Sequence, residues 1–185
     1  RGPRIIWSID DAIGGDDTIS GNAGGDYILG GVNGVNDDPI YGNAASPGSN
    51  DGADIITGDG GRLDFSPITD TDGPTKLDLV QTTALGVGGS DTIYGNAGAD
   101  IIMGGAAGDT IYGDDDTGLA GERDGNDILI GDNGQVLYAG GIITQIRTTD
   151  GSESTGGADK IEGNEADDII IGGPNGSPDT LYGNE

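Results

Sequence analysis

The 185-residue chain is too poor in large apolar side chains for an ordinary globular core, since 32% of its residues are hydrophobic and it has one Phe and one Trp. Its 33 acidic residues outnumber 7 basic ones, and this net charge of −26 makes nucleic acid an unexpected partner and predicts a self-repulsion that bound cations would relieve. The chain lacks Cys and His, which excludes disulfides, thiolate or imidazole metal sites and the commonest general base. No apolar run reaches transmembrane length, so membrane insertion is not expected.

From residue 14 onward, a glycine-rich turn, an aspartate and a short apolar strand recur, with a period of nine residues where nothing is inserted. Each copy has Ile or Leu two residues after the aspartate and Gly four residues after it. Such a period is typical of a calcium-binding parallel β-helix in which one aliphatic side chain per strand points inward and alternate copies stack. The aspartates of the eleven copies are Asp17, Asp26, Asp38, Asp54, Asp91, Asp100, Asp109, Asp127, Asp159, Asp168 and Asp179.

Two long insertions interrupt this pattern, at residues 62–85 and 135–153. Each has two segments of alternating apolar and polar residues around a turn, which predicts a β-hairpin. Residues 5–10 (IIWSID) are similar, and we interpret them as the returning strand of a hairpin that begins before residue 1. Because a hairpin and two coils both span about 9.6 Å, we expect successive hairpins to stack into a second, continuous sheet.

A longer internal repeat lies above the short one. Residues 14–31, 88–105 and 156–173 are three versions of one eighteen-residue coil. We therefore expect a single solenoid over residues 1–185, divided into super-repeats at about 1–61, 62–134 and 135–185. Since each super-repeat holds four short motifs, both hairpins should leave from the same flank.

The outward positions of the short strands are unequal. Alternate strands carry outward apolar pairs, such as Ile101 with Met103 and Ile128 with Ile130, so one sheet is apolar on both faces and must be covered. The apolar sides of the hairpins and a neighbouring chain are the two candidate covers. The other sheet carries a row of tyrosines, Tyr41, Tyr94, Tyr112 and Tyr182, which is either cross-strand packing or a binding stripe.

Residues 21–29 (GNAGGDYIL), 95–103 (GNAGADIIM) and 104–112 (GGAAGDTIY) resemble the RTX (repeats-in-toxin, haemolysin-type) calcium-binding nonapeptide GGxGxDxUx. The resemblance covers most of the chain. It implies an all-β fold, a right-handed parallel β-roll, here with β-hairpins inserted on one flank, and export by a type I secretion system. It also implies Ca²⁺ between stacked turns, held by the eleven aspartates and by turn carbonyls, including those of Gly21, Ala23, Gly95, Ala97, Gly104, Ala106 and Gly163.

Calcium suits these residues on chemical grounds, because it takes six to eight oxygen ligands from carboxylates and carbonyls in a flexible geometry. Stacking of alternate turns leaves room for about nine ions at most, and fewer where a turn is interrupted. Asp59, Asp114 and Asp132 follow the glycine that opens a turn, and they are either further ligands or plain turn residues. No nucleophile–base pair is evident, so we do not expect an enzyme.

The sequence therefore predicts a secreted, extracellular calcium-binding structural segment of a larger surface protein, such as a fibre, an adhesin stalk or a surface layer. Self-association is expected through the hairpins and the Ile-rich face. The alternative is a calcium-dependent secretion and folding module of a toxin or hydrolase whose catalytic domain is absent. The regular placement of the hairpins favours the structural segment, because a folding module needs no periodic decoration.

Overall fold

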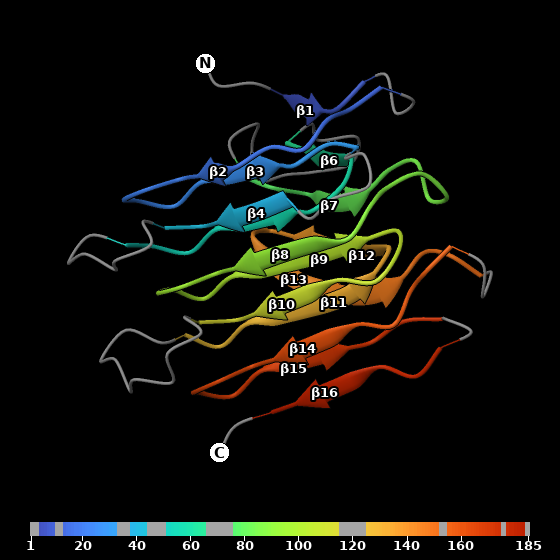
Figure 1. Cartoon of the computed structure of the whole chain (residues 1–185). Coiled ribbons are helices and arrows are strands. Elements are labelled where there is room, and N and C mark those ends of the chain that lie inside the picture. Colours follow the sequence, from blue (N-terminus) through green and yellow to red (C-terminus); the bar gives the residue numbers. More distant parts are fainter. Residues whose placement is uncertain are drawn as a thin grey trace.

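The computed structural model describes residues 4–9, 13–32, 38–43, 51–65, 76–114, 125–151, 155–174 and 177–183. The regular elements of this part of the chain are all β-strands, arranged in two parallel sheets and one antiparallel sheet (Figure 1). No described segment is a helix long and apolar enough to cross a membrane. The all-β prediction is therefore confirmed.

The first parallel sheet has six short strands, which stack from the N-terminal to the C-terminal end of the molecule (Figure 1). The inward Ile or Leu residues of neighbouring strands lie in register, as Ile40, Ile93 and Ile111 do. In spatial order these strands are β2 (Ile19–Ser20), β4 (Asp38–Tyr41), β8 (Asp91–Tyr94), β10 (Thr110–Tyr112), β14 (Lys160–Glu162) and β16 (Thr180–Tyr182).

The second parallel sheet takes the alternate strands, so the chain passes back and forth between the two sheets. The two rows of inward aliphatic side chains meet in one thin core, which includes the fully buried Ile56, Ile102 and Leu129. In spatial order these strands are β3 (Tyr27–Leu29), β5 (Ile55–Thr57), β9 (Ile101–Gly105), β11 (Ile128–Asp132) and β15 (Ile169–Ile171).

The insertions build the third sheet, which is antiparallel. Both leave between a strand of the second sheet and a strand of the first, and their strands pair with each other across β7 and β12. The hypothesis of a continuous second layer of hairpins is therefore confirmed; the predicted hairpin turn at 68–75 lies outside the described residues. The strand order is β1 (Ile5–Trp7), β6 (Gly61–Asp64), β7 (Leu79–Thr82), β12 (Gly134–Ala139) and β13 (Ile142–Thr148).

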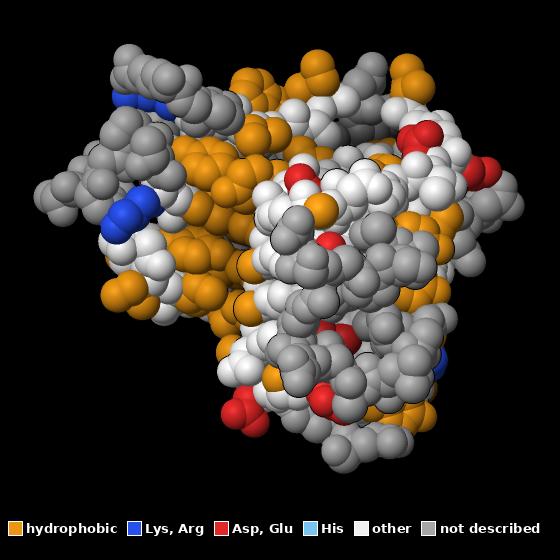
Figure 2. All heavy atoms as spheres, turned by 90° about the vertical axis from the view of Figure 1, so that its left-hand side faces the viewer, with side chains coloured by type: hydrophobic (Ala, Val, Ile, Leu, Met, Phe, Trp, Pro, Cys, Tyr) orange, Lys and Arg blue, Asp and Glu red, His pale blue; other side chains and the backbone are white. Residues whose placement is uncertain are grey.

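This antiparallel sheet covers the Ile-rich face. Val80 and Val136 from the hairpins form a second buried cluster with the outward side chains of β9 and β11, namely Ile101, Met103, Ile128 and Ile130. The hairpins, and not a neighbouring chain, therefore cover the Ile-rich face here, which the sequence alone did not decide. Figure 2, which faces one flank of the molecule, shows a large hydrophobic patch left of centre, smaller hydrophobic groups elsewhere, and scattered acidic side chains.

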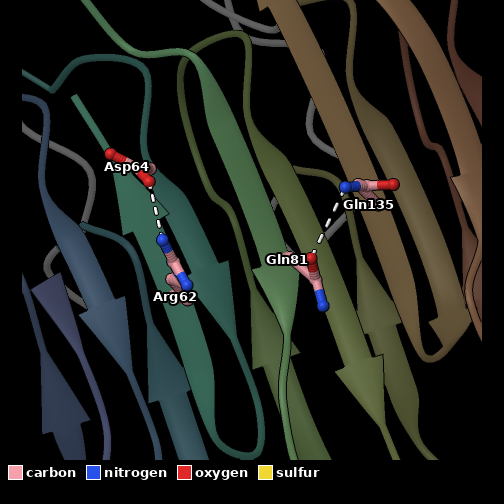
Figure 3. Close-up of polar contacts among 4 residues, drawn as sticks. All are labelled: Arg62, Asp64, Gln81 and Gln135. Carbon is pink, nitrogen blue, oxygen red and sulfur yellow. Dashed lines mark hydrogen bonds and ion pairs between the residues drawn. The ribbon is translucent and has the colours of Figure 1, made fainter. Parts of the chain in front are cut away.

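The outer face of the antiparallel sheet is polar where the strands are central. Arg62 forms an ion pair with Asp64 at 2.7 Å, and Gln135 donates to Gln81 at 3.4 Å (Figure 3). Arg147 also donates to Gln135, at 2.6 and 2.8 Å. The Gln135 contacts tie β12 to β7 and to β13, whereas the Arg62–Asp64 ion pair lies within β6.

The tyrosine row lies on the outer face of the first sheet. The rings of Tyr41, Tyr94 and Tyr112 are stacked with centroids 5.0 Å apart, and the Lys160 ammonium lies 4.9 Å from the Tyr112 centroid. Each face of the middle ring is therefore occupied by a neighbouring ring. Tyr41, Tyr94 and Tyr112 thus pack across neighbouring strands, whereas Tyr182 lies opposite Glu162, outside the stack.

Candidate metal centre: two columns of aspartates

The strands place the eleven predicted aspartates in two columns, one along each flank of the parallel sheets. A shared hydrogen bond defines the columns: the backbone N–H of one aspartate donates to Oδ1 of the aspartate one coil further on. Asp54 donates to Asp100 and Asp100 donates to Asp127, each at a distance of 2.7 Å. The first flank runs through Asp26, Asp54, Asp100, Asp127 and Asp168.

The second flank repeats the arrangement where the chain returns to the first sheet. Asp91 donates to Asp109 and Asp109 donates to Asp159, each at a distance of 2.8 Å. The strand register places Asp38 beside Asp91, which joins the two parts of the column. This flank runs through Asp17, Asp38, Asp91, Asp109, Asp159 and Asp179.

These hydrogen bonds satisfy one carboxylate oxygen and leave the other turned into the molecule. Oδ2 is buried and has no hydrogen-bond partner in six of the aspartates, which are Asp26, Asp54, Asp100, Asp109, Asp159 and Asp168. Burying a carboxylate oxygen without a hydrogen-bond partner costs free energy. Six such oxygens in one structure indicate that a bound group other than protein serves as their partner.

Glycine carbonyls face these oxygens. A Cβ placed on Gly42 would collide with Oδ2 of Asp54 and would lie 2.7 Å from the carbonyl oxygen of Gly95. On the other flank, a Cβ on Gly131 would collide with Asp159 and lie 2.7 Å from the carbonyl oxygen of Gly172. Carboxylate and carbonyl oxygens are therefore no more than about 5 Å apart, close enough for both to bind one calcium ion at the usual distance of about 2.3–2.6 Å. Only glycine leaves this space open.

The predicted glycines Gly21, Gly95 and Gly163 have a second role. Each precedes an asparagine in the left-handed region, with φ of 69° at Asn22, 65° at Asn96 and 67° at Asn164. Asparagine tolerates this conformation better than most residues, and Asn22 Nδ2 donates to the Ser20 carbonyl at 3.1 Å. The asparagines thus supply the left-handed residue of the turn directly after the glycine that lines the cradle.

Burial raises the pKa values of these aspartates. Desolvation is the main cause at Asp54 and Asp159, whose pKa values rise to about 6, and at Asp100, whose pKa rises to about 8. Neighbouring carboxylates of the same column add to the rise, as Asp54 does at Asp100. The folded chain therefore opposes ionisation of the groups whose charge calcium would balance.

The columns are tightest in the middle of the molecule. Asp54, Asp100, Asp109 and Asp127 are at most 2% exposed, whereas Asp17 is exposed and Asp179 is partly so. The predicted turn residues Ala97 and Ala106 are buried, whereas Ala23 is exposed. The central turns thus offer better enclosed sites than the terminal ones.

The donor set fits calcium. Within the described residues no three carboxylates, histidines or cysteines converge on one point, so each cradle offers one carboxylate and backbone carbonyls. Hard oxygen ligands without nitrogen or sulfur suit Ca²⁺ better than a transition metal, and calcium accepts carbonyls readily. Ca²⁺ bound there would supply positive charge to the unpartnered Oδ2 atoms.

The comparison with protein families gives the same answer. The RTX calcium-binding nonapeptide repeat is found at residues 12–33, 85–119 and 153–174, with four copies. The chain carries RTX calcium-binding repeats. The matched segments include seven of the column aspartates, Asp17, Asp26, Asp91, Asp100, Asp109, Asp159 and Asp168. Neither the curated proteins nor the solved structures yield a match to the chain.

The sequence did not reveal that each aspartate has two tasks. Its Oδ1 accepts the N–H of the preceding coil, and its Oδ2 faces the glycine cradle. The period of nine pointed to the residue but not to this division, because the acceptor and donor are separated by 18 to 50 residues. Asp59, left open as ligand or turn residue, has a structural role in the turn, because both its oxygens accept backbone N–H groups, from Gly89 at 3.3 Å and Ala106 at 2.7 Å.

Proposed function

We propose that this chain is a calcium-folded extracellular structural segment of a larger surface protein, built as a right-handed β-roll. The observation that carries the proposal is the double column of buried aspartates, each joined to the next coil through Oδ1. Six of them present an unpartnered Oδ2 to a turn or to a glycine cradle. Up to about nine Ca²⁺ ions would complete the columns and offset most of the net charge of −26.

Folding is coupled to calcium in this proposal. The core between the parallel sheets is one aliphatic side chain thick per strand, and the two flanks hold rows of like charge. Metal binding to such a chain contributes directly to the free energy of folding. Millimolar extracellular calcium would fold the segment, and a calcium-poor cytosol would leave it expanded, which suits export before folding.

The structural role is supported by the hairpin layer. Both insertions leave from one flank, pair across β7 and β12, and cover the Ile-rich sheet. A module that only had to fold on secretion would not need this second sheet. The super-repeats of about 70 residues would then be units of a stiff, laterally thickened rod, and self-association would use the hairpin sheet. We propose no catalytic role.

The test is small-angle X-ray scattering and far-UV circular dichroism of the chain in chelator and in millimolar Ca²⁺, with Mg²⁺ as the control. In chelator we expect a radius of gyration approaching the roughly 46 Å of an unfolded chain, and in calcium one much nearer the roughly 16 Å of a compact chain. Mg²⁺ should not substitute, because it demands a tighter octahedron. Equal profiles in all three solutions would overturn the proposal. Electron microscopy of the parent protein in calcium would then separate rods from a monomeric folding module.

A further inference from the structure

The two insertions are closed by equivalent aspartates that precede them. Asp59 Oδ1 accepts the N–H of Gly89 at 3.3 Å, and Asp132 Oδ1 accepts the N–H of Gly157 at 3.1 Å. Each bond ties the start of an insertion to the turn that resumes after it. At this level the two closures are the same.

Their second oxygens differ. Oδ2 of Asp59 accepts the N–H of Ala106 at 2.7 Å. Gly105 (φ 121°) lies against the Asp59 carboxylate, and Gly173 (φ 134°) lies against the Asp132 carboxylate in the same way. The residue after Gly105 is Ala106, so the equivalent residue in the second closure is Pro174, which follows Gly173. Proline has no N–H to donate. Oδ2 of Asp132, in a side chain that is fully buried, accordingly has no hydrogen-bond partner.

Two further unpartnered oxygens lie at the same closure. Asn133 is 1% exposed and Asp150 is 8% exposed, and Oδ1 of each has no hydrogen-bond partner. Their other atoms tie them together, because Asn133 Nδ2 donates to Asp150 Oδ2 at 3.2 Å and Thr155 Oγ1 donates to the same oxygen at 3.0 Å. Thr155 is followed by Gly156, whose backbone lies against the Asp132 carboxylate.

Among the described residues of the first insertion there is no such group of oxygens. Thr83 donates its N–H to Gly60, and Thr149 donates its N–H to Asn133, so these pairs are equivalent. The positions of Asn133 and Asp150 are therefore occupied by Gly60 and Ala84 in the first insertion. The loss of one N–H at Pro174 thus coincides with the gain of a carboxylate and an amide.

The charge of the cluster is not balanced by protein. Among the described residues neither Asp132 nor Asp150 forms an ion pair. Burial is the main cause that raises the pKa of Asp132 to about 7, and the charges of Asp159 and Asp150 add to it. A water molecule has two hydrogens to give, and the cluster offers three acceptors. A cation bound at this closure would supply the partner that one water molecule cannot supply to all three.

We propose that Asp132, Asn133 and Asp150 hold a divalent cation of the calcium class at the base of the second hairpin, outside the repeat cradles. With two carboxylates and one amide, the site would draw its remaining ligands from backbone oxygens or water. The ion would fasten the hairpin sheet to the roll at the closure where the protein lacks an N–H donor. The first closure uses Ala106 instead and needs no ion.

The test counts calcium ions bound to the full chain by native mass spectrometry and equilibrium dialysis. The double variant N133G/D150A copies the first insertion, so it is compatible with the fold. We expect it to bind one Ca²⁺ fewer per chain than the wild type, with the same far-UV circular dichroism at saturating calcium. A control, Glu165→Gln, removes one exposed charge and should leave the count unchanged.

A second variant keeps the ligands and restores the donor. Pro174→Ala returns an N–H to the position held by Ala106 in the other closure, so calcium should bind more weakly at this site alone. An unchanged ion count in N133G/D150A together with unchanged affinity in Pro174→Ala would overturn the site. A wild-type chain that binds no calcium at all would instead contradict the proposed function, so the two failures are distinguishable.

Discussion

Asp100 offers the sharpest prediction, because it lies at the centre of one column and its substitution should have opposite effects with and without calcium. Its side chain is 1% exposed, its Oδ1 accepts the N–H of Asp54 at 2.7 Å, and its Oδ2 has no partner. Burial raises its pKa to about 8. The unfolded chain releases this proton near pH 3.8, so between these two pH values the folded, calcium-free chain is penalised increasingly as the pH rises.

The size of the penalty follows from the pKa. At pH 7.5 it is about 5 kcal/mol, since each pH unit above the unfolded value costs about 1.4 kcal/mol. Asp100→Asn removes the charge and keeps an oxygen that can accept from Asp54. Without calcium the variant should therefore be more stable than the wild type by up to that amount, whereas at saturating calcium it should bind fewer ions.

The assay is far-UV circular dichroism in chelator, titrated with trimethylamine N-oxide, which favours the folded state. Asp100→Asn should fold at a lower osmolyte concentration than the wild type. Asp100→Ala should be less stable than Asp100→Asn by about 1–3 kcal/mol, because it leaves the buried N–H of Asp54 without an acceptor. A variant Asp100→Asn that needs as much osmolyte as the wild type, or that equals Asp100→Ala, would refute the reasoning.

Three further predictions concern the cradle, the pH and the hairpin sheet. Gly95→Ala places a Cβ against Asp100 and the Gly113 carbonyl, so calcium dialysis should show fewer ions, whereas Gly15→Ala, with open space around it, should bind as the wild type does. Lowering the pH from 8 to 5 should weaken calcium binding, measured by calorimetry, because the buried aspartates with raised pKa values take up protons in the folded chain. For the same reason the lower pH should increase the β-sheet signal in chelator, and a decrease of that signal would contradict the predicted direction of the pH effect. Leu63→Ala, at a fully buried hairpin position, should lower the free energy of unfolding in calcium by about 2–5 kcal/mol, measured by denaturant titration. The number of bound calcium ions should stay the same, and a changed number would show that calcium binding in the cradles depends on the hairpin sheet.

The sequence predicted the parts of the fold that repeat locally. The aspartate and the aliphatic residue two positions later keep their phase, so the strands and the inward side chains Ile93, Ile102 and Ile111 could be assigned before the structure was known. The hairpin strands were also predicted, because their alternation is local. The cover of the Ile-rich face was not decided, since hairpins and a neighbouring chain offer the same apolar chemistry.

The parts that sequence reasoning missed depend on contacts between distant coils. The hydrogen bond from Asp109 to Asp159 spans an insertion, and nothing near either residue indicates which oxygen accepts. The role of Asp59 likewise depends on the N–H of Ala106 in the next coil. The corresponding proline could be recognised as a missing donor only after the two closures had been aligned in space.

The central claim is that calcium completes the columns between one aspartate and the facing glycine carbonyls. Anomalous diffraction from crystals grown in calcium tests it most directly. We predict peaks beside Oδ2 of Asp54, Asp100 and Asp159, each between that oxygen and a glycine carbonyl of the adjoining coil. An ordered structure in millimolar calcium with these aspartate columns intact and no anomalous density beside the three oxygens would contradict the account.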